Sequence, residues 1–126
     1  MNKSERKILV VDDEQHICSI LSRILGNAGY QVITASDGKK ALQLTKDKEP
    51  DLILLDLMMP GINGREVCHI VREFSPEIRI VYFTAKVESD PLLLKELRGE
   101  ADAFITKPAT SKQILSKINS LLDDDR

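Results

Sequence analysis

Short runs of apolar residues alternate along the chain with longer segments in which apolar residues recur every three or four positions. A short continuous apolar run is typical of a strand that is covered on both faces, as the strands of parallel sheets are. This pattern predicts strands at residues 8–11, 32–35, 52–55, 78–83 and 103–105. Each predicted strand is followed by a segment with helical periodicity.

These segments have the spacing of amphipathic helices. The second opens at Asp37-Gly38 and stops before Pro50, the third follows the turn signal Asn63-Gly64, and the fourth has Pro91 in its first turn. The first and last carry clear apolar stripes, namely Ile17, Ile20, Leu21, Ile24, Leu25 and Ala28 in one and Ile114, Leu115, Ile118, Leu121 and Leu122 in the other. Strands alternating with helices predict a parallel sheet with right-handed crossovers and helices on both faces.

The length of 126 residues fits one domain, which we place at 1–126 with a core from about 7 to 122 and an acidic tail at 123–126. The tail fits a solvated helix end or natural terminus, and also the start of a linker. The net charge of −2, with both signs interspersed, disfavours direct binding of nucleic acid.

Several features favour a cytoplasmic location. No apolar run reaches the roughly 18–20 residues that span a bilayer. The start of the chain is polar and lacks the pattern of a signal peptide. Cys18 and Cys68 have neither metal-ligand spacing nor a disulfide framework, so we expect reduced thiols.

Polar residues that can carry chemistry lie at or just beyond the ends of four of the five predicted strands. Asp12 and Asp13 come after the first strand, Asp56 after the third, Thr84 after the fourth, and Lys107 shortly after the fifth. The carboxyl ends of parallel strands share one edge of a sheet, and ligands bind where the strand order reverses. If the order is 2-1-3-4-5, the first and third strands are neighbours and the three carboxylates meet.

Three clustered carboxylates repel one another and need a counter-charge. Mg²⁺, which prefers oxygen ligands, can supply it, and the ammonium of Lys107 suits a single phosphoryl oxygen. Asp56 can then act as a nucleophile and form an aspartyl phosphate.

Each of these residues also has an ordinary explanation. Asp12 and Asp13 can cap a helix, Asp56 can be a turn acid, Thr84 a routine strand-end residue, and Lys107 a solvated lysine. All these explanations would have to coincide at four strand ends, which favours a single functional site.

Four motifs resemble those of the receiver domains of bacterial two-component response regulators, in the same order and with the same spacing. They are the runs Ile8–Glu14, Asp56–Gly64, Phe83–Ala85 and Thr106–Pro108. The resemblance covers nearly the whole chain. It implies a flavodoxin-like (βα)5 fold, that is, a doubly wound five-stranded parallel sheet of order 2-1-3-4-5.

The resemblance also implies roles for the acidic residues. Asp56 is the phosphoacceptor, and Asp13 and Asp56 are direct ligands of Mg²⁺, with Mn²⁺ as an alternative ion. Asp12 acts mostly through a bound water, and the main-chain carbonyl of Met58 is the remaining protein ligand.

The same resemblance assigns the parts of a switch. Thr84 is the hydroxyl that turns towards a phosphoryl oxygen, and Lys107 pairs with the phosphate. The Lys107-Pro108 peptide is cis in the family. Phe104 aligns with the aromatic that moves inward on activation and so remodels the face of the fourth helix, fifth strand and fifth helix. The alternative is that Phe104 is a plain core or edge aromatic.

Some residues depart from the usual family pattern. Ala109 stands where an aromatic is frequent, and Ala103 where an acid supports dimerisation of winged-helix regulators. Tyr82 is bulkier than the usual aliphatic residue. Candidates for contact with a kinase lie off the apolar stripe of the first helix, namely Gln15, Cys18, Ser19 and Ser22.

The predicted function is therefore phosphorelay signalling by a phosphoacceptor switch that is not an enzyme with a separate product. A sensor histidine kinase or histidine phosphotransfer protein would donate the phosphoryl group, and an output domain or effector protein would respond. The main alternative is a receiver-like interaction module that works without phosphorylation. A phosphohydrolase is disfavoured because Leu57-Met58 follows Asp56 in place of an Asp-x-Asp pair. The chain fits both a stand-alone regulator and an amino-terminal receiver of a longer one.

Overall fold

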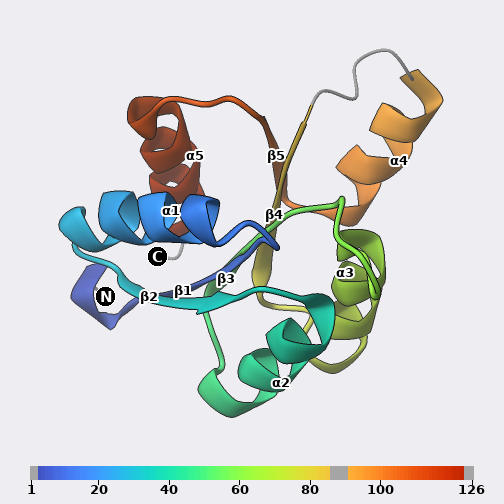
Figure 1. Cartoon of the computed structure of the whole chain (residues 1–126), viewed down its shortest axis with the longest axis horizontal. Coiled ribbons are helices and arrows are strands. Elements are labelled where there is room, and N and C mark those ends of the chain that lie inside the picture. The colour runs from blue at the N-terminus through green and yellow to red at the C-terminus, as the bar shows by residue number, and fades with distance from the viewer. Residues whose placement is uncertain (1–2, 86–90, 124–126) are drawn as a thin grey trace.

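The computed structural model describes residues 3–85 and 91–123 (Figure 1). A 3-10 helix at Lys3–Glu5 precedes five strand–helix pairs. These are β1 (Lys7–Val11), α1 (Gln15–Asn27), β2 (Gln31–Ala35), α2 (Gly38–Lys48), β3 (Leu52–Leu55), α3 (Gly64–Phe74), β4 (Arg79–Thr84), α4 (Pro91–Glu100), β5 (Ala103–Thr106) and α5 (Ser111–Asp123). The acidic tail predicted at 123–126 lies outside the described residues after Asp123.

The five strands form one parallel sheet of order β2-β1-β3-β4-β5, so the predicted fold class and strand order are confirmed. Val11 at the end of β1 pairs with Leu55 at the end of β3. The register continues for one step, because the Asp56 amide donates to the Val11 carbonyl at 3.0 Å. The residues that follow these two strands therefore lie next to each other at the carboxyl edge.

Two apolar cores lie on the two faces of the sheet. Helices α1 and α5 cover one face, and α2, α3 and α4 cover the other (Figure 1). Successive residues of a strand point to opposite faces, so Ile8 and Val10 enter one core while Leu9 and Val11 enter the other. This is why β3 is apolar at every position and the middles of β1 and β4 are apolar on both faces.

The predicted starts of α2 and α3 are confirmed by their caps. Asp37 accepts a hydrogen bond from the Lys40 amide at 2.8 Å, directly before Gly38 begins α2. Asn63 and Glu66 form a reciprocal capping box at the start of α3. Such caps satisfy amides that have no partner within the helix, so they define where the third helix begins after the β3–α3 loop.

The predicted orientation of α1 is partly wrong. Cys18, expected on the exposed side, is buried together with Leu21 and Leu25, whereas Ile20 of the predicted stripe is 41% exposed. The helix docks on the sheet along a narrow line of residues spaced three and four apart. Cys18 is therefore a core residue and is removed from the candidates for partner contact.

Both cysteines are free and buried, as the absence of a disulfide framework indicated. Within the described part of the chain, no helix has the length and apolar character needed to cross a bilayer.

Candidate functional site

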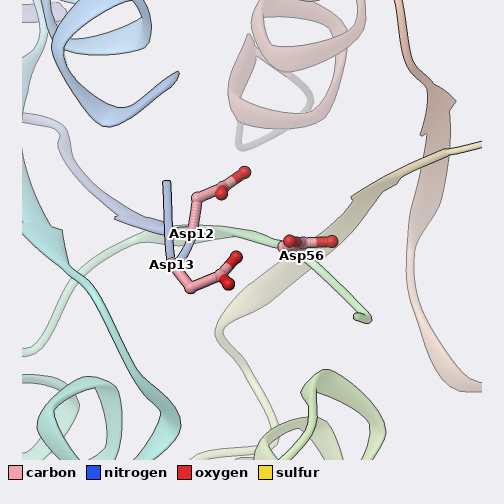
Figure 2. A group of neighbouring side chains, drawn as sticks. All are labelled: Asp12, Asp13 and Asp56. Carbon is pink, nitrogen blue, oxygen red and sulfur yellow. The ribbon is translucent and has the colours of Figure 1, made fainter. Parts of the chain in front are cut away.

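Three carboxylates converge at the carboxyl edge of the sheet. Asp12 and Asp13 follow β1 and Asp56 follows β3, and one oxygen of each lies within 4.8 Å of the others (Figure 2). Asp12 and Asp56 are buried, whereas Asp13 is exposed. The predicted meeting of these residues is confirmed, and a set of clustered carboxylate oxygens open to solvent on one side fits a hard divalent cation such as Mg²⁺.

Main-chain amides hold two of the carboxylates in place. Asp12 Oδ1 accepts from the Glu14 amide at 2.9 Å, and Asp56 Oδ1 accepts from the Met58 amide at 3.1 Å. The N-cap of α1 is Glu14, and it forms no side-chain capping bond. The alternative explanation of Asp12 and Asp13 as caps of this helix is therefore wrong.

Lys107 extends from the end of β5 into the carboxylate cluster. Its Nζ lies 2.8 Å from Asp12 Oδ2 and 3.7 Å from Asp56 Oδ2, and its side chain is 21% exposed. Burial acts to lower the pKa of Lys107, but the hydrogen bond to Asp12 and the charge of Asp56 outweigh it and raise that pKa. Lys107 is thus a protonated member of the site, and its interpretation as a solvated surface lysine is wrong. The Lys107–Pro108 peptide is cis, as predicted.

The electrostatic surroundings of Asp56 disfavour its ionised form. Burial raises the pKa of Asp56, and the charges of Asp12 and Asp13 act in the same direction. The Met58 amide and Lys107 oppose this effect without overcoming it. An additional positive charge next to Asp56 would stabilise the carboxylate, which is the nucleophilic form.

Thr84 ends β4 at the same edge of the sheet. It is fully buried, and its Oγ1 is the one buried side-chain oxygen or nitrogen in the described residues that has no hydrogen-bond partner. A buried hydroxyl without a partner costs about 1–3 kcal/mol. The main chain of Thr84 is satisfied, since its carbonyl accepts from the Lys107 amide at 2.7 Å. A free hydroxyl in this place can bond an oxygen that enters the site.

Phe104 lies on the outermost strand β5, half-buried and paired in register with Tyr82 of β4. The two rings meet edge to face, with centroids 6.4 Å apart and an interplanar angle of 88°. Phe104 therefore packs on the same side of the sheet as the Thr84 side chain, where an inward movement would bring it towards α4.

Gly64 is a site residue whose place in a turn and in the Asp56–Gly64 motif was evident from the sequence, but whose contact with Asp56 was not. A Cβ atom at this position would lie 2.3 Å from the Asp56 carbonyl oxygen and 2.8 Å from the Leu57 Cα. The start of α3 therefore packs directly against the backbone of the candidate phosphoacceptor. The signal in the sequence was a glycine at the first position of a capped helix, where a close backbone approach is one of the reasons for glycine.

The fold and the site together define a class of protein. Residues 8–119 match the response regulator receiver domain family, and the chain belongs to this family. Phosphorelay signalling is the function that follows from this membership.

Individual relatives agree with this assignment. The chain is 43% identical over 123 residues to the alkaline phosphatase synthesis transcriptional regulatory protein PhoP of Bacillus subtilis, covering 97% of this chain and 49% of that protein. The chain thus spans about half the length of this relative. Among solved structures, it resembles the chemotaxis protein CheY4 of Vibrio cholerae with 30% identity and a TM-score of 0.85, covering 91% of this chain and 97% of that one. It also resembles the response regulator TrrA of Thermotoga maritima, solved in complex with Mg²⁺ and BeF, with 33% identity, a TM-score of 0.82, and coverage of 92% and 98%.

Proposed function

We propose that Asp56 accepts a phosphoryl group from a sensor histidine kinase or a histidine phosphotransfer protein. The observation that carries this proposal is the junction of Asp56 with Asp12, Asp13 and Lys107 at one edge of the sheet. The free hydroxyl of Thr84 at the end of the neighbouring strand supports it further. Lys107 and the Thr84 hydroxyl can bind oxygens of a transferred phosphoryl group, and the carboxylates of Asp12 and Asp13 can hold the cation that offsets its charge.

The reaction needs little covalent chemistry from the protein. A carboxylate oxygen of Asp56 forms a bond to phosphorus as the bond from phosphorus to the donor imidazole breaks, and the electron pair of that bond stays with the imidazole nitrogen. The ammonium of Lys107 balances charge on the phosphoryl oxygens, and the Met58 amide orients the attacking carboxylate. Rate enhancement comes from positioning and electrostatic stabilisation.

Mg²⁺, or Mn²⁺ in its place, would be held by the acidic cluster. In this proposal Asp13 and Asp56 are direct ligands, Asp12 acts through a water molecule, and the main-chain carbonyl of Met58 completes the protein ligands. A divalent cation held there would neutralise charge on the transferring oxygens. The similar response regulator TrrA was solved in complex with Mg²⁺ and BeF, which supports a divalent cation as the cofactor.

The output of the switch follows from Thr84 and Phe104. When Thr84 bonds a phosphoryl oxygen, Phe104 moves inward and the face of α4, β5 and α5 is remodelled for an output domain or effector protein. This is a population shift between two arrangements, biased by the new contacts. In this proposal residues 1–126 form a single receiver domain in the cytoplasm, which modifies itself and has no separate substrate to turn over.

The proposal predicts one Mg²⁺-dependent phosphoryl adduct on the native protein after incubation with acetyl phosphate. Intact-mass spectrometry with Mg²⁺ and with EDTA checks this, and the adduct should be labile to hydroxylamine, as an acyl phosphate is. Peptide mapping should place it between residues 52 and 65. Absence of an adduct both with acetyl phosphate and with a panel of histidine kinases would favour the alternative, an interaction module that does not need phosphorylation.

Mg²⁺ is expected to stabilise the folded chain, because it relieves the repulsion among the three carboxylates. At a concentration tenfold above its dissociation constant, the free energy of unfolding should rise by about 1.4 kcal/mol, measured by urea denaturation at constant ionic strength. Asp13→Asn should lose most of this gain. Glu14→Gln, which removes a charge next to Asp13 without touching the cluster, should keep it. An equal gain in the native protein and in Asp13→Asn would contradict the assigned ligand.

A further inference from the structure

The carboxylate of Glu100, at the end of α4, has hydrogen-bond partners on two other elements. Arg65, in the first turn of α3, donates from Nε to Glu100 Oε1 at 3.0 Å and to Oε2 at 3.1 Å, and its Nη2 donates to Oε2 as well. The hydroxyl of Tyr82 on β4 donates to Glu100 Oε1 at 2.8 Å. The Glu100 side chain is only 15% exposed, so these bonds are partly shielded from water.

The main chain of Glu100 is held too. Arg72 of α3 donates from Nε and Nη2 to the Glu100 carbonyl at 3.4 and 3.3 Å, and it also pairs with Asp102 at 2.9 Å. The last carbonyls of a helix have no partner within the helix, and a negative side chain at that end opposes the helix dipole. Arg72 gives the Glu100 carbonyl a hydrogen-bond partner, and Arg65 neutralises the negative charge of the Glu100 side chain. The two arginines thereby attach the last turn of α4 to α3.

Tyr82, for which the sequence suggested no role, is the link from Glu100 to the switch. It is fully buried, two residues before Thr84, and its ring forms the surface against which Phe104 packs. Burial, with the neighbouring Cys68 and Glu100, raises the pKa of Tyr82, so its hydroxyl stays a donor. Burial alone would raise the pKa of Glu100, but the bonds from Arg65 and Tyr82 lower it, so the acceptor is ionised.

The beginning of α4 has a different character. Leu92 is 77% exposed and Lys95 and Glu96 are exposed, whereas Leu97 in the last turn is buried. Leu93 is half-buried against the core, and Glu96 pairs with Arg65 at 3.4 Å. Most of the described hydrogen bonds from α4 to other elements are nevertheless made by Glu100, in its last turn.

We propose that Glu100, together with Arg65 and Tyr82, forms a pivot that fixes the last turn of α4 while its first turns move during switching. The proposal rests on the proposed function, because the movement begins with Thr84 and Phe104. It assigns Glu100 and Tyr82 as positioning residues. The pivot joins α3, whose start packs against Asp56, to β4, which carries Thr84. The phosphorylated residue and the switch hydroxyl are therefore both connected to the same fixed turn of α4.

Hydrogen exchange of the free protein tests the pivot itself. In Glu100→Gln, the amides of residues 97–102 should exchange about tenfold faster than in the native protein, because the charge-assisted bonds are weakened. Glu96→Gln is the matched control: Glu96 also pairs with Arg65, at 3.4 Å, but its side chain is 62% exposed. This control should change exchange by no more than about twofold. Tyr82→Phe removes only the hydroxyl and should raise the exchange rates of the same amides by a smaller factor. This variant keeps the test informative if Glu100→Gln folds poorly.

Addition of beryllofluoride with Mg²⁺ tests the role of the pivot in switching. In the native protein, exchange should change at Thr84, Phe104 and residues 92–96 but not at residues 97–100. In Glu100→Gln the change should extend through all of α4. A change in residues 97–100 of the native protein as large as that in 92–96, or equal behaviour of Glu100→Gln and Glu96→Gln, overturns the pivot alone. Unchanged exchange throughout the native protein would overturn the proposed switch, and the pivot with it.

Discussion

Asp56→Asn is expected to abolish the phosphoryl adduct while preserving the fold. The amide side chain keeps the size of the carboxylate and an oxygen that can accept from the Met58 amide, but it is not a nucleophile towards phosphorus. Intact-mass spectrometry after incubation with acetyl phosphate and Mg²⁺ measures the effect, and circular dichroism checks the fold.

A matched control lies at the other end of the same strand. Asp51 directly precedes β3 as Asp56 directly follows it, and its Oδ2 accepts from the Lys7 amide at 2.8 Å. Asp51→Asn should therefore keep the adduct. An adduct on Asp56→Asn that maps to Asp12 or Asp13 would move the acceptor role to that residue.

The same substitution should raise stability at neutral pH in the absence of Mg²⁺. The pKa of Asp56 is raised in the folded protein, first by burial, so its ionised form is less favourable there than in the unfolded chain. The advantage of Asp56→Asn should be full above the folded pKa, shrink as the pH falls through that value, and vanish below the unfolded pKa. Urea denaturation at neutral and acidic pH would show this trend.

Gly64→Ala is expected to destabilise the protein and to slow phosphorylation at Asp56. The added methyl group would lie 2.3 Å from the Asp56 carbonyl oxygen, and the atoms it meets are backbone atoms, which cannot turn aside as a flexible side chain can. The cost should be about 3 kcal/mol in the free energy of unfolding. A shift of about 1 Å in the Asp56 backbone should lower the phosphorylation rate about 100-fold.

Gly26→Ala is the control for this substitution. Gly26 is also a helical glycine, in α1, but apart from its chain neighbours and the backbone of its own helix no atom lies within 4 Å of the Cβ position. Alanine there should be neutral or stabilise by up to about 1 kcal/mol, because it favours the helix. Equal urea midpoints for Gly64→Ala and Gly26→Ala would contradict the prediction. They would mean that the backbone around Asp56 accommodates the added methyl group without loss of stability.

The order of elements and the location of the site could be predicted from the sequence because both depend on local patterns. Five apolar runs separated by helical periodicity favour a parallel sheet, and all carboxyl ends of parallel strands share one edge. Given the strand order 2-1-3-4-5, which the resemblance to receiver domains implied, the meeting of Asp12, Asp13, Asp56 and Lys107 followed from their place at the ends of strands. No knowledge of side-chain packing was needed for this step.

The face of α1 that enters the core could not be predicted so well. Apolar residues are spread over more than one side of this helix. The angle at which the helix docks decides that Cys18 is buried and Ile20 is exposed. Periodicity reports that one side is apolar, but it does not report where the line of contact with the sheet runs.

The sequence by itself therefore determined the fold class, the sheet edge and the charged groups that lie there, because local patterns place these groups at the carboxyl ends of strands and a parallel sheet brings all such ends to one edge. Only the tertiary structure decided the contacts of Gly64 with the Asp56 backbone, the free hydroxyl of Thr84, and the attachment of Glu100 to Arg65 and Tyr82. These features join side chains or backbone from separate elements. Their physical basis is the packing of those elements against one another, which no local pattern specifies.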